Sequence, residues 1–329
     1  MMKPLYCLFI LGAIAALIAG CKGPTQTESN GGNGQSNAPG YLYAGTYGDG
    51  IFRSTDHGLT WSRMDAGLTC DSVLAFASDS AYLFAGTLEG VFRSSDNGQS
   101  WTQVNNGLSN RFILSLLSNG TNLFAGTAND GMAGGVFRST NDGESWSETT
   151  LSASYTYIDN IDALAEVGPY LLAGSEWVSG VFRSSDGGAS WKLFLAGPGT
   201  NTLLAAVGPT LYVGEDDPAG PSLYRSDDSG ASWHYVPRSP KVVSSFFASG
   251  ANMLAETQSG LSHSTDTGKV WTNTSFSNGL TINTFVSDGV GIFAGTSANG
   301  VFVSTDSGAT WSPANKGIDS EYVMTLAIH

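Results

Sequence analysis

Residues 94–101 read Ser-Ser-Asp-Asn-Gly-Gln-Ser-Trp, and this stretch decides the fold because its pattern returns along the whole chain. The pattern Ser-x-Asp-x-Gly-x-Ser/Thr-Trp occurs seven times, with small departures, at intervals of 38 to 45 residues. A repeat of about 40 residues in an all-β sequence is typical of a propeller blade. The sequence therefore predicts an all-β fold, a single seven-bladed β-propeller. The tryptophans that end the seven repeats are Trp61, Trp101, Trp146, Trp191, Trp233, Trp271 and Trp311.

Each repeat carries signals for four short strands, most clearly in the second blade. Residues 73–77, 82–87 and 90–94 form three strand-like segments, and residues 101–104 begin a fourth. Gly and Asn separate them, as is usual at turns. The folded part opens at Tyr41 with a second strand and ends, within residues 322–329, with a first strand. We therefore expect the C-terminal strand to complete the N-terminal blade, residues 41–65, and to close the ring without a large unpaired sheet edge.

The repeated pattern resembles the Asp-box, also called the BNR repeat, and the resemblance covers residues 41–329. Related boxes occur in sialidases, sortilin-like receptors, xyloglucanases, and the photosystem II stability and assembly factors. The resemblance implies a β-hairpin between the third and fourth strands of each blade. Side-chain chemistry agrees, because a carboxylate can accept backbone N–H bonds within a tight turn and the glycine two residues later tolerates a positive φ.

We interpret the boxes as structural, since seven near-identical sites around a ring rarely all perform chemistry. Asn141 replaces Asp in the third box and still offers an amide oxygen. Val270 replaces Ser or Thr in the sixth box and lacks the hydroxyl. The alternative is metal binding or catalysis by the box aspartates. The predicted structural residues are Asp56, Trp61, Asp96, Trp101, Asn141, Trp146, Asp186, Trp191, Asp228, Trp233, Asp266, Trp271, Asp306 and Trp311.

An arginine precedes the first Ser of five boxes. Sialidases hold a substrate carboxylate with an arginine triad, so the resemblance raises a sialidase hypothesis. We instead interpret this column as part of the scaffold, because it lies on third strands away from the axis and recurs in five blades. The column comprises Arg53, Arg93, Arg138, Arg183 and Arg225, with His263 and Val303 in the last two blades.

In a propeller, the turns between second and third strands share one face with the links between blades, here called the link face. The Asp-box hairpins lie on the opposite, box face. Ligands usually meet the face where loops from several blades converge over the axis. Blades three to five have the longest link-face loops, rich in aromatic and acidic side chains suited to a peptide or a sugar ring. The candidate ligand-binding residues are Trp177, Tyr155, Tyr157, Asp159, Glu176, Asp130, Asp216, Asp217 and Arg111; the links add Asp71, Lys241, Asp319 and Glu321.

Two functions remain open. The first is a non-catalytic binding or assembly scaffold, although Trp177 packing as a lid on its own blade would weaken its part in binding. The second is a glycoside hydrolase, which needs two carboxyl groups about 5–10 Å apart across a cleft. No local motif singles out such a pair, and the xyloglucanases that the chain resembles use two propellers that face a groove. No calcium-loop spacing surrounds Asp159 or Asp216. We expect no metal, no cofactor and no catalytic residue.

The N-terminal 40 residues differ in composition from the repeats. Residues 1–20 contain Lys3 and an apolar run too short for a comfortable membrane span, which indicates a removed signal peptide. Residues 18–21, Ile-Ala-Gly-Cys, resemble a bacterial lipobox, which implies cleavage before Cys21 and lipid on its thiol; an ordinary signal peptide is the alternative. Residues 21–40 then form a flexible tether rich in Gly, Ser and Asn. We expect a lipid-anchored protein of the bacterial cell envelope, on the outer membrane or cell surface.

Charge narrows the class of partner. The chain has 14 basic and 28 acidic residues, a net charge of −14, which disfavours nucleic acid. The acidic charge also disfavours a function shared with the photosystem II factors. The resemblance implies that those factors work through an arginine-rich patch, whereas the exposed loops of this chain are acidic. We expect a monomer whose partner is an envelope protein or a glycan of basic or neutral character. Cys70 stands alone in the mature domain, so no intrachain disulfide is expected there, and it is interpreted as a packed side chain.

Overall fold

The computed structural model describes residues 40–129, 134–152, 160–175, 180–196, 202–207, 210–215, 223–236, 239–240, 245–257, 260–274, 276 and 280–329. The predicted signal peptide, Cys21 and nearly all of the tether precede these ranges, so those predictions lie outside the described residues. Within the ranges, every regular element is a β-strand, and no helix is long and apolar enough to cross a bilayer.

The strands are short, and the fourth strand of most blades has only two residues. In chain order they are β1 (Leu42–Thr46), β2 (Ile51–Ser54), β3 (Ser62–Arg63), β4 (Val73–Ser78), β5 (Leu83–Thr87), β6 (Gly90–Ser94), β7 (Thr102–Gln103), β8 (Ile113–Ser118), β9 (Leu123–Thr127), β10 (Val136–Ser139), β11 (Ser147–Glu148), β12 (Thr150–Ser152), β13 (Ile161–Val167), β14 (Tyr170–Ser175), β15 (Gly180–Ser184), β16 (Ser190–Ala196), β17 (Thr202–Val207), β18 (Thr210–Glu215), β19 (Leu223–Ser226), β20 (His234–Tyr235), β21 (Ser245–Ser249), β22 (Asn252–Thr257), β23 (Gly260–Ser264), β24 (Thr272–Asn273), β25 (Ile282–Ser287), β26 (Ile292–Thr296), β27 (Val301–Ser304), β28 (Ser312–Pro313) and β29 (Val323–Ile328).

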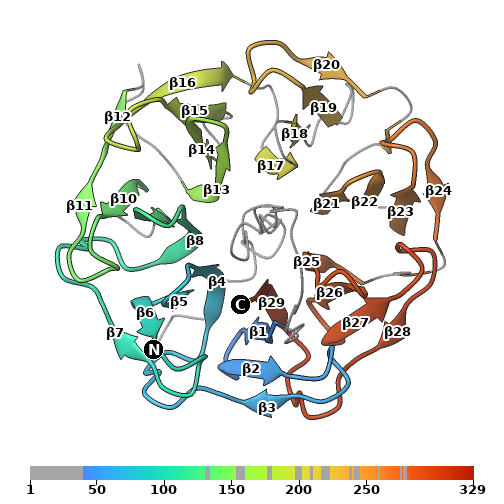
Figure 1. The fold of residues 1–329 in the computed structure, drawn as a ribbon, viewed down its shortest axis with the longest axis horizontal. Coiled ribbons are helices and arrows are strands. Elements are labelled where there is room, and N and C mark those ends of the chain that lie inside the picture. The colour runs from blue at the N-terminus through green and yellow to red at the C-terminus, as the bar shows by residue number, and fades with distance from the viewer. Residues whose placement is uncertain are drawn as a thin grey trace, which may run out of the picture.

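These strands form seven sheets, antiparallel except for the pair β12–β16, which confirms the predicted number of blades. Blade 1 has the strand order β29-β1-β2-β3, and blades 2, 3, 5, 6 and 7 are β4–β7, β8–β11, β17–β20, β21–β24 and β25–β28. Blade 4 contains β13–β16 and gains β12 as a fifth, outer strand. Figure 1 shows the sheets arranged around an axis, with β29, β4, β8, β13, β17, β21 and β25 innermost.

The C-terminal strand closes the ring as predicted. β29 pairs antiparallel with β1 in a register that runs from Leu42 opposite Ile328 to Gly45 opposite Thr325. In Figure 1 the blue N-terminal strand β1 and the red C-terminal strand β29 lie side by side in one blade. A contact of 2.7 Å between His57 Nδ1 and Asp288 Oδ2 also joins blade 1 to blade 7. The first and last described strands therefore meet inside one sheet.

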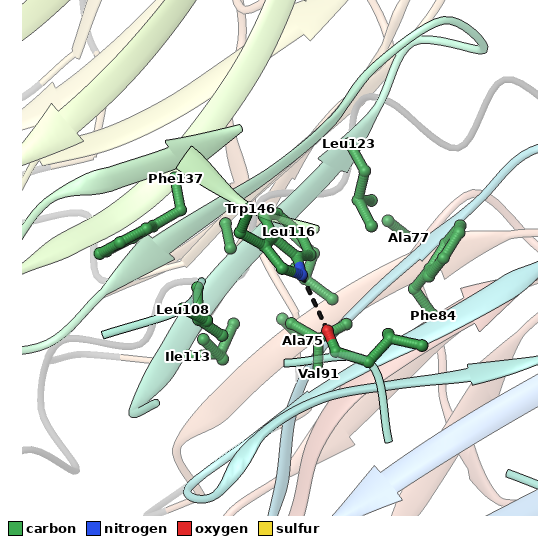
Figure 2. Packing of buried hydrophobic residues seen from close by; sticks show 12 residues of the cluster. Ala75, Ala77, Phe84, Val91, Leu108, Ile113, Leu116, Leu123, Phe137 and Trp146 are labelled. Atoms are coloured by element: carbon green, nitrogen blue, oxygen red, sulfur yellow. Dashed lines mark hydrogen bonds between the residues drawn. The ribbon is translucent and has the colours of Figure 1, made fainter. Parts of the chain in front are cut away.

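Among the described residues, the apolar core forms eight clusters, and seven of them lie one between each pair of neighbouring blades. In each of these seven the box tryptophan of one blade packs against the preceding blade, whereas the eighth joins Leu74, Leu114 and Met324 of inner strands. Figure 2 shows the cluster between blades 2 and 3, where Trp146 lies among Leu116, Val91 and Phe137. The box thus joins neighbouring sheets, because its indole is shared between them.

The indole N–H groups show two arrangements. Trp61, Trp101 and Trp146 donate to backbone carbonyls of the preceding blade, at Ala314 (2.8 Å), Met64 (2.9 Å) and Val104 (2.8 Å). In contrast, Trp271 and Trp311 donate to the glycine carbonyl of their own boxes and are only half-buried. Trp61, Trp101, Trp146 and Trp191 are therefore buried between sheets, whereas Trp233, Trp271 and Trp311 pack against the same kind of cluster but are only half-buried.

Three of the links between blades use the same glycine turn. Gly67, Gly107 and Gly317 have φ values of +85°, +84° and +95°, in the left-handed region. A Cβ atom at Gly67 would lie 2.3 Å from the carbonyl oxygen of Trp101, which no side chain tolerates. Next to this glycine, the Ala66 carbonyl accepts a bond of 2.8 Å from the Trp101 amide. The turn therefore fastens the tryptophan of one blade to the link that enters it.

The described start of the link from blade 3 to blade 4 differs from these turns. Thr150–Ser152 form β12, which pairs in parallel with β16 at the outer edge of blade 4. β16 is also longer than the other fourth strands, with seven residues. This extra strand was not predicted, and it ties blade 3 to blade 4 by backbone hydrogen bonds.

Candidate functional site

Hydrogen bonds between loops define the link face. The amides of Gly48 and Gly50, in the turn after β1, donate to the Asp71 carbonyl of the following link at 3.1 and 2.9 Å. The Ala128 amide donates in the same way to Phe112, and the Ser297 amide to Thr281. Each second-to-third-strand turn named here is thus bonded to a link between blades, as the propeller interpretation predicts.

The box hairpins form a closed hydrogen-bond system on the other face. In the first box, Asp56 Oδ1 accepts from the hydroxyl of Ser54 (2.8 Å) and the amide of Thr60 (2.8 Å). Asp56 Oδ2 accepts from the hydroxyl of Thr60 (2.5 Å), and the Ser54 hydroxyl oxygen accepts from the Gly58 amide (2.9 Å). The same set of bonds surrounds Asp96, Asp186, Asp228 and Asp306. Both oxygens of each carboxylate are bonded within the hairpin, which supports the structural interpretation of the boxes.

The two boxes that depart from the pattern, those of Asn141 and Val270, keep the hydrogen bonds from backbone amides to the side-chain oxygen. Asn141 Oδ1 accepts from the Ser139 hydroxyl and the Ser145 amide, while its Nδ2 donates to the Ser145 hydroxyl at 3.0 Å. Asp266 accepts from the backbone amides of Val270 and Lys269 in place of a hydroxyl. Backbone acceptance by the side-chain oxygen is therefore common to all seven boxes.

The residue between Asp and Gly has a constraint that the sequence pattern does not reveal. It adopts a left-handed φ in every box, including non-glycine residues such as His57 (55°) and Thr267 (61°). In blade 4 this position is Gly187. Side chains there cost conformational energy, and the hydrogen bonds of the box hold the backbone in place.

The box carboxylates titrate at low pH because their hairpins stabilise the charged form. Bonds from the hydroxyl and amide of Thr310, and from the Ser304 hydroxyl, lower the pKa of Asp306 to about 2. Equivalent bonds from Ser232 and Ser226 lower the pKa of Asp228 to about 2. A group whose pKa is lower in the folded state stabilises the fold above its unfolded pKa, about 3.9 for Asp, and loses this contribution as pH falls toward its folded pKa.

We therefore predict an acid-sensitive ring. Urea unfolding should show constant stability from pH 7 down to about pH 5, then a fall between about pH 4 and pH 2 as the boxes protonate. Asp306→Asn should fold at pH 7, as the natural Asn141 box does, and should lose less stability than the parent between pH 5 and pH 2. Equal acid dependence in the two proteins would contradict a role for box protonation.

The arginine column lies on third strands, as predicted, and its described contacts are with the scaffold. Arg53 and Arg93 donate through Nη1 to the backbone carbonyls of Asn97 (2.6 Å) and Asp142 (2.9 Å), in the box of the next blade. Their guanidinium groups also lie 4.8 and 4.7 Å from the ring centroids of Tyr41 and Tyr82. Arg138 bonds to Asn122 within its own blade. These contacts place the arginines around the outside of the ring, where they do not converge on one anion.

Most of the predicted ligand-binding residues lie outside the described part of the chain. Of the nine candidates, only Arg111 is described; it is exposed and stands in the link before β8. Asp71, Asp319 and Glu321 are also exposed on links, whereas Lys241 is not described. The residues outside the described ranges are Trp177, Tyr155, Tyr157, Asp159, Glu176, Asp130, Asp216 and Asp217.

Two residues that sequence reasoning missed, Tyr47 and Tyr322, are exposed on the link face. Their exposed fractions are 38% and 44%, and the amide of Tyr47 donates to the Tyr322 carbonyl at 3.1 Å. Each follows or precedes a buried strand, so the sequence pattern presents it as part of that strand. A signal was available in the glycines at positions 48 and 50, which mark an open turn after Tyr47.

The described surface also contains a small pocket, and it lies on the box face. It has a volume of about 120 Å³ and lies between the turns that precede β22 and β26 and the box of blade 7. Its lining includes Ser249, Asn252, Ser287, Val290 and Ser307, and no ionisable side chain. Within the described ranges, no group of three or more His, Cys, Asp or Glu side chains is placed to hold a metal ion. Cys70 is free and buried there.

Comparison with known proteins supports the fold. A sequence model of the BNR/Asp-box repeat matches residues 52–63. The comparison with curated proteins gives no match. Solved propellers similar to the chain have low sequence identity, so they bear on the fold alone.

One such structure is the extracellular domain of the one-component system BT4673 from B. thetaiotaomicron, with 18% identity and a TM-score of 0.54 over 86% of this chain and 40% of that one. Another is YCF48 bound to D1 peptide, with 14% identity and a TM-score of 0.60 over 80% of this chain and 89% of that one. A third is the GH74 xyloglucanase from Xanthomonas campestris, with 17% identity and a TM-score of 0.58 over 88% of this chain and 52% of that one. The chain thus spans less than two thirds of the first and third of these proteins.

Proposed function

We propose that this seven-bladed Asp-box β-propeller is a non-catalytic binding or assembly scaffold of the bacterial cell envelope. Its link face would meet a protein or a glycan partner. The observation that carries the proposal is a difference between the two faces of the ring. The box carboxylates are bonded inside their own hairpins, while exposed carboxylates and tyrosines stand on the link face, on turns fixed by backbone hydrogen bonds.

Two of the similar structures support this reading. YCF48 was solved with a bound peptide, and this chain spans 89% of it, so the two are propellers of comparable size. The BT4673 propeller belongs to an extracellular domain, which agrees with the signal peptide proposed for this chain. At 14% and 18% identity, these similarities concern architecture.

The alternative is an extracytoplasmic glycoside hydrolase. The similarity to the GH74 xyloglucanase favours it, although this chain spans only 52% of that enzyme. A hydrolase would require an acid and a second carboxylate facing each other across a cleft. On the link face such a pair would come from the exposed acidic side chains of the turns and links.

Two assays on the full-length chain separate these functions. A scaffold should capture an envelope protein or a defined glycan from an envelope extract or a glycan array, and should release no chromophore from aryl glycosides. Trp177→Ala should reduce capture, whereas Tyr235→Ala, on the outer strand β20, should not. Turnover of a glycoside that is abolished by Asp→Ala or Glu→Ala changes on the link face would replace the scaffold function with the hydrolase.

Lipid attachment at Cys21 gives a further prediction. The proposed anchor attaches lipid to the Cys21 thiol, and stable membrane association requires more than one membrane-buried acyl chain or a second signal. Radiolabelled palmitate should be incorporated into the full-length protein and lost in Cys21→Ser, which should also move from the detergent phase to the aqueous phase. Cys70→Ser is the matched control and should keep its label, because Cys70 is buried. Label retained in Cys21→Ser would refute the anchor.

A further inference from the structure

We propose that one part of the link face, over blades 7, 1 and 2, binds a basic polypeptide segment. This inference rests on the proposed function, and it names the chemistry of the partner and the place where it binds. We call this surface the tyrosine–acid sector. It consists of Tyr47, Asp49, Asp65, Asp71, Glu321 and Tyr322.

The sector is held by backbone hydrogen bonds across three blades. The Gly300 amide of blade 7 donates to the Glu321 carbonyl at 2.9 Å, and the Tyr47 amide of blade 1 donates to the Tyr322 carbonyl at 3.1 Å. The Gly48 and Gly50 amides then bond to the carbonyl of Asp71, in the link that enters blade 2. The side chains therefore project from a backbone that is already fixed, so a partner need not order the backbone when it binds.

The two tyrosines are neighbours, and they supply apolar contact area. The large apolar or aromatic side chains with the greatest exposure in the described residues are Tyr47, Leu59, Tyr235, Val270, Val290 and Tyr322. Leu59, Val270 and Val290 belong to boxes or to a box-face turn, and Tyr235 is on an outer strand. Tyr47 and Tyr322 alone among these six stand on the link face, and their backbones are hydrogen-bonded to each other. Tyrosine offers a rigid amphipathic surface that is enriched at protein interfaces.

The charges around the tyrosines are mostly negative. Two basic groups are near the sector: Arg63, and the exposed Lys316 in the link that carries Glu321. Asp65 accepts a hydrogen bond from Arg63, and Asp71 Oδ1 lies 3.8 Å from Arg63 Nη2. The pKa of the Arg63 guanidinium is raised, mainly by its hydrogen bond to Asp65. The negative charges of Asp71 and Asp49 raise this pKa further. Three carboxylates, those of Asp65, Asp71 and Asp49, therefore surround the Arg63 guanidinium, and Glu321 is exposed on the adjacent link. The side chain of Asp71 is 52% exposed, so its charge is available to a partner.

The arrangement fits lysine and arginine side chains better than a metal ion. Among the described residues, no group of three or more His, Cys, Asp or Glu side chains is placed to hold a metal ion, whereas separate carboxylates can each pair with one basic side chain. The tether of this protein carries Lys22 as its one basic residue, so it is a poor occupant. A partner segment with several basic residues and an apolar or aromatic side chain complements both the carboxylates and the tyrosine pair.

The test uses a fluorescein-labelled oligo-lysine peptide that contains one tryptophan, with the full chain and anisotropy as readout. The triple variant Asp49→Asn, Asp71→Asn, Glu321→Gln should bind at least ~10-fold more weakly, a loss of about 1.4 kcal/mol. Its fold should be intact, because Asp71 and Glu321 make their structural bonds through backbone carbonyls. The matched control is Asp142→Asn, Glu144→Gln, Glu166→Gln, which removes three exposed carboxylates elsewhere and should change affinity by less than ~3-fold.

The aromatic part is tested separately. Tyr47→Ser with Tyr322→Ser should weaken binding of the same peptide and leave its dependence on salt unchanged, while Tyr235→Ser should have no effect. Equal losses in the two triple variants, or no binding by the parent chain at low salt, would overturn the inference. If an envelope partner is captured equally by the parent and the sector triple variant, the inference fails and the scaffold function stands. Turnover of a glycoside would instead overturn the scaffold function itself.

Discussion

Removal of residues 322–329 is expected to abolish cooperative folding of the whole propeller. These residues contain β29, whose side chains Val323, Met324, Leu326 and Ala327 are almost completely buried. Burial of each large aliphatic side chain contributes about 1.5–3 kcal/mol, so their loss approaches the total stability of a typical domain, about 5–15 kcal/mol. The truncation also leaves β1 as an unpaired inner edge in blade 1. Thermal unfolding by circular dichroism, with light scattering to detect association through that edge, measures the effect.

A circular permutant provides the control for this truncation. The backbones of Tyr41 and His329 exchange two hydrogen bonds, at 2.8 and 3.0 Å, so β29 and β1 are positioned to form an ordinary hairpin. Placing residues 322–329 ahead of Gly40 through a short Asn-Gly turn should restore cooperative melting near the parent temperature. A truncated chain that melts like the parent would contradict ring closure. So would a permutant that fails to recover stability, although it contains every strand.

The second large effect is expected at the seam between blade 7 and blade 1. Trp61→Ala should lower the free energy of unfolding by about 3–5 kcal/mol, the usual range for large buried aromatic side chains. Trp61 is buried among residues of both blades and donates to the Ala314 carbonyl of blade 7. Urea unfolding at pH 7 is the measurement, with Trp61→Phe as the conservative variant that keeps the apolar contact and loses the hydrogen bond.

Trp271→Ala is the matched control for Trp61→Ala. Trp271 occupies the same place in the sixth box, but it is half-buried and donates to the Gly268 carbonyl of its own hairpin. Its replacement should therefore cost less than half as much as that of Trp61. Equal destabilisation by the two substitutions would contradict this account. It would mean that the deeper burial of Trp61 and its hydrogen bond to blade 7 add no stability beyond that provided by Trp271.

Much of the fold could be predicted from the sequence because each strand lies at a nearly constant distance from the box of its repeat. The strand expected at residues 73–77 is observed as Val73–Ser78, and the one at residues 90–94 as Gly90–Ser94. The fourth strand of that blade is shorter than residues 101–104, since the Trp101 amide bonds to the link carbonyl of Ala66 instead of to β6. The sequence pattern does not reveal that Trp101 bonds to the neighbouring blade, because this bond depends on how the two blades pack.

The parts that escaped prediction depend on tertiary contacts. β12 has only three residues, and its parallel pairing with β16 depends on how the neighbouring blade is placed. Likewise, Tyr47 follows the fully buried Thr46 with no break in the strand pattern, so its exposure depends on where the turn projects. The candidate site was sought in the long loops of blades 3 to 5, most of which lie outside the described residues. The sector that we propose from the described residues lies over blades 7, 1 and 2.

The central claim is that the box hairpins hold the ring together while partners bind the opposite face. The most direct test blocks each face in turn on the same blade. Glu89→Cys lies in the link-face turn between β5 and β6, and Ser95→Cys lies in the box of blade 2; both positions are exposed. After each variant is coupled to a bulky polyethylene glycol maleimide, capture of the envelope partner is quantified. The label at position 89 should abolish capture and the label at position 95 should leave it unchanged. Capture that survives the first label and is lost with the second would contradict the account.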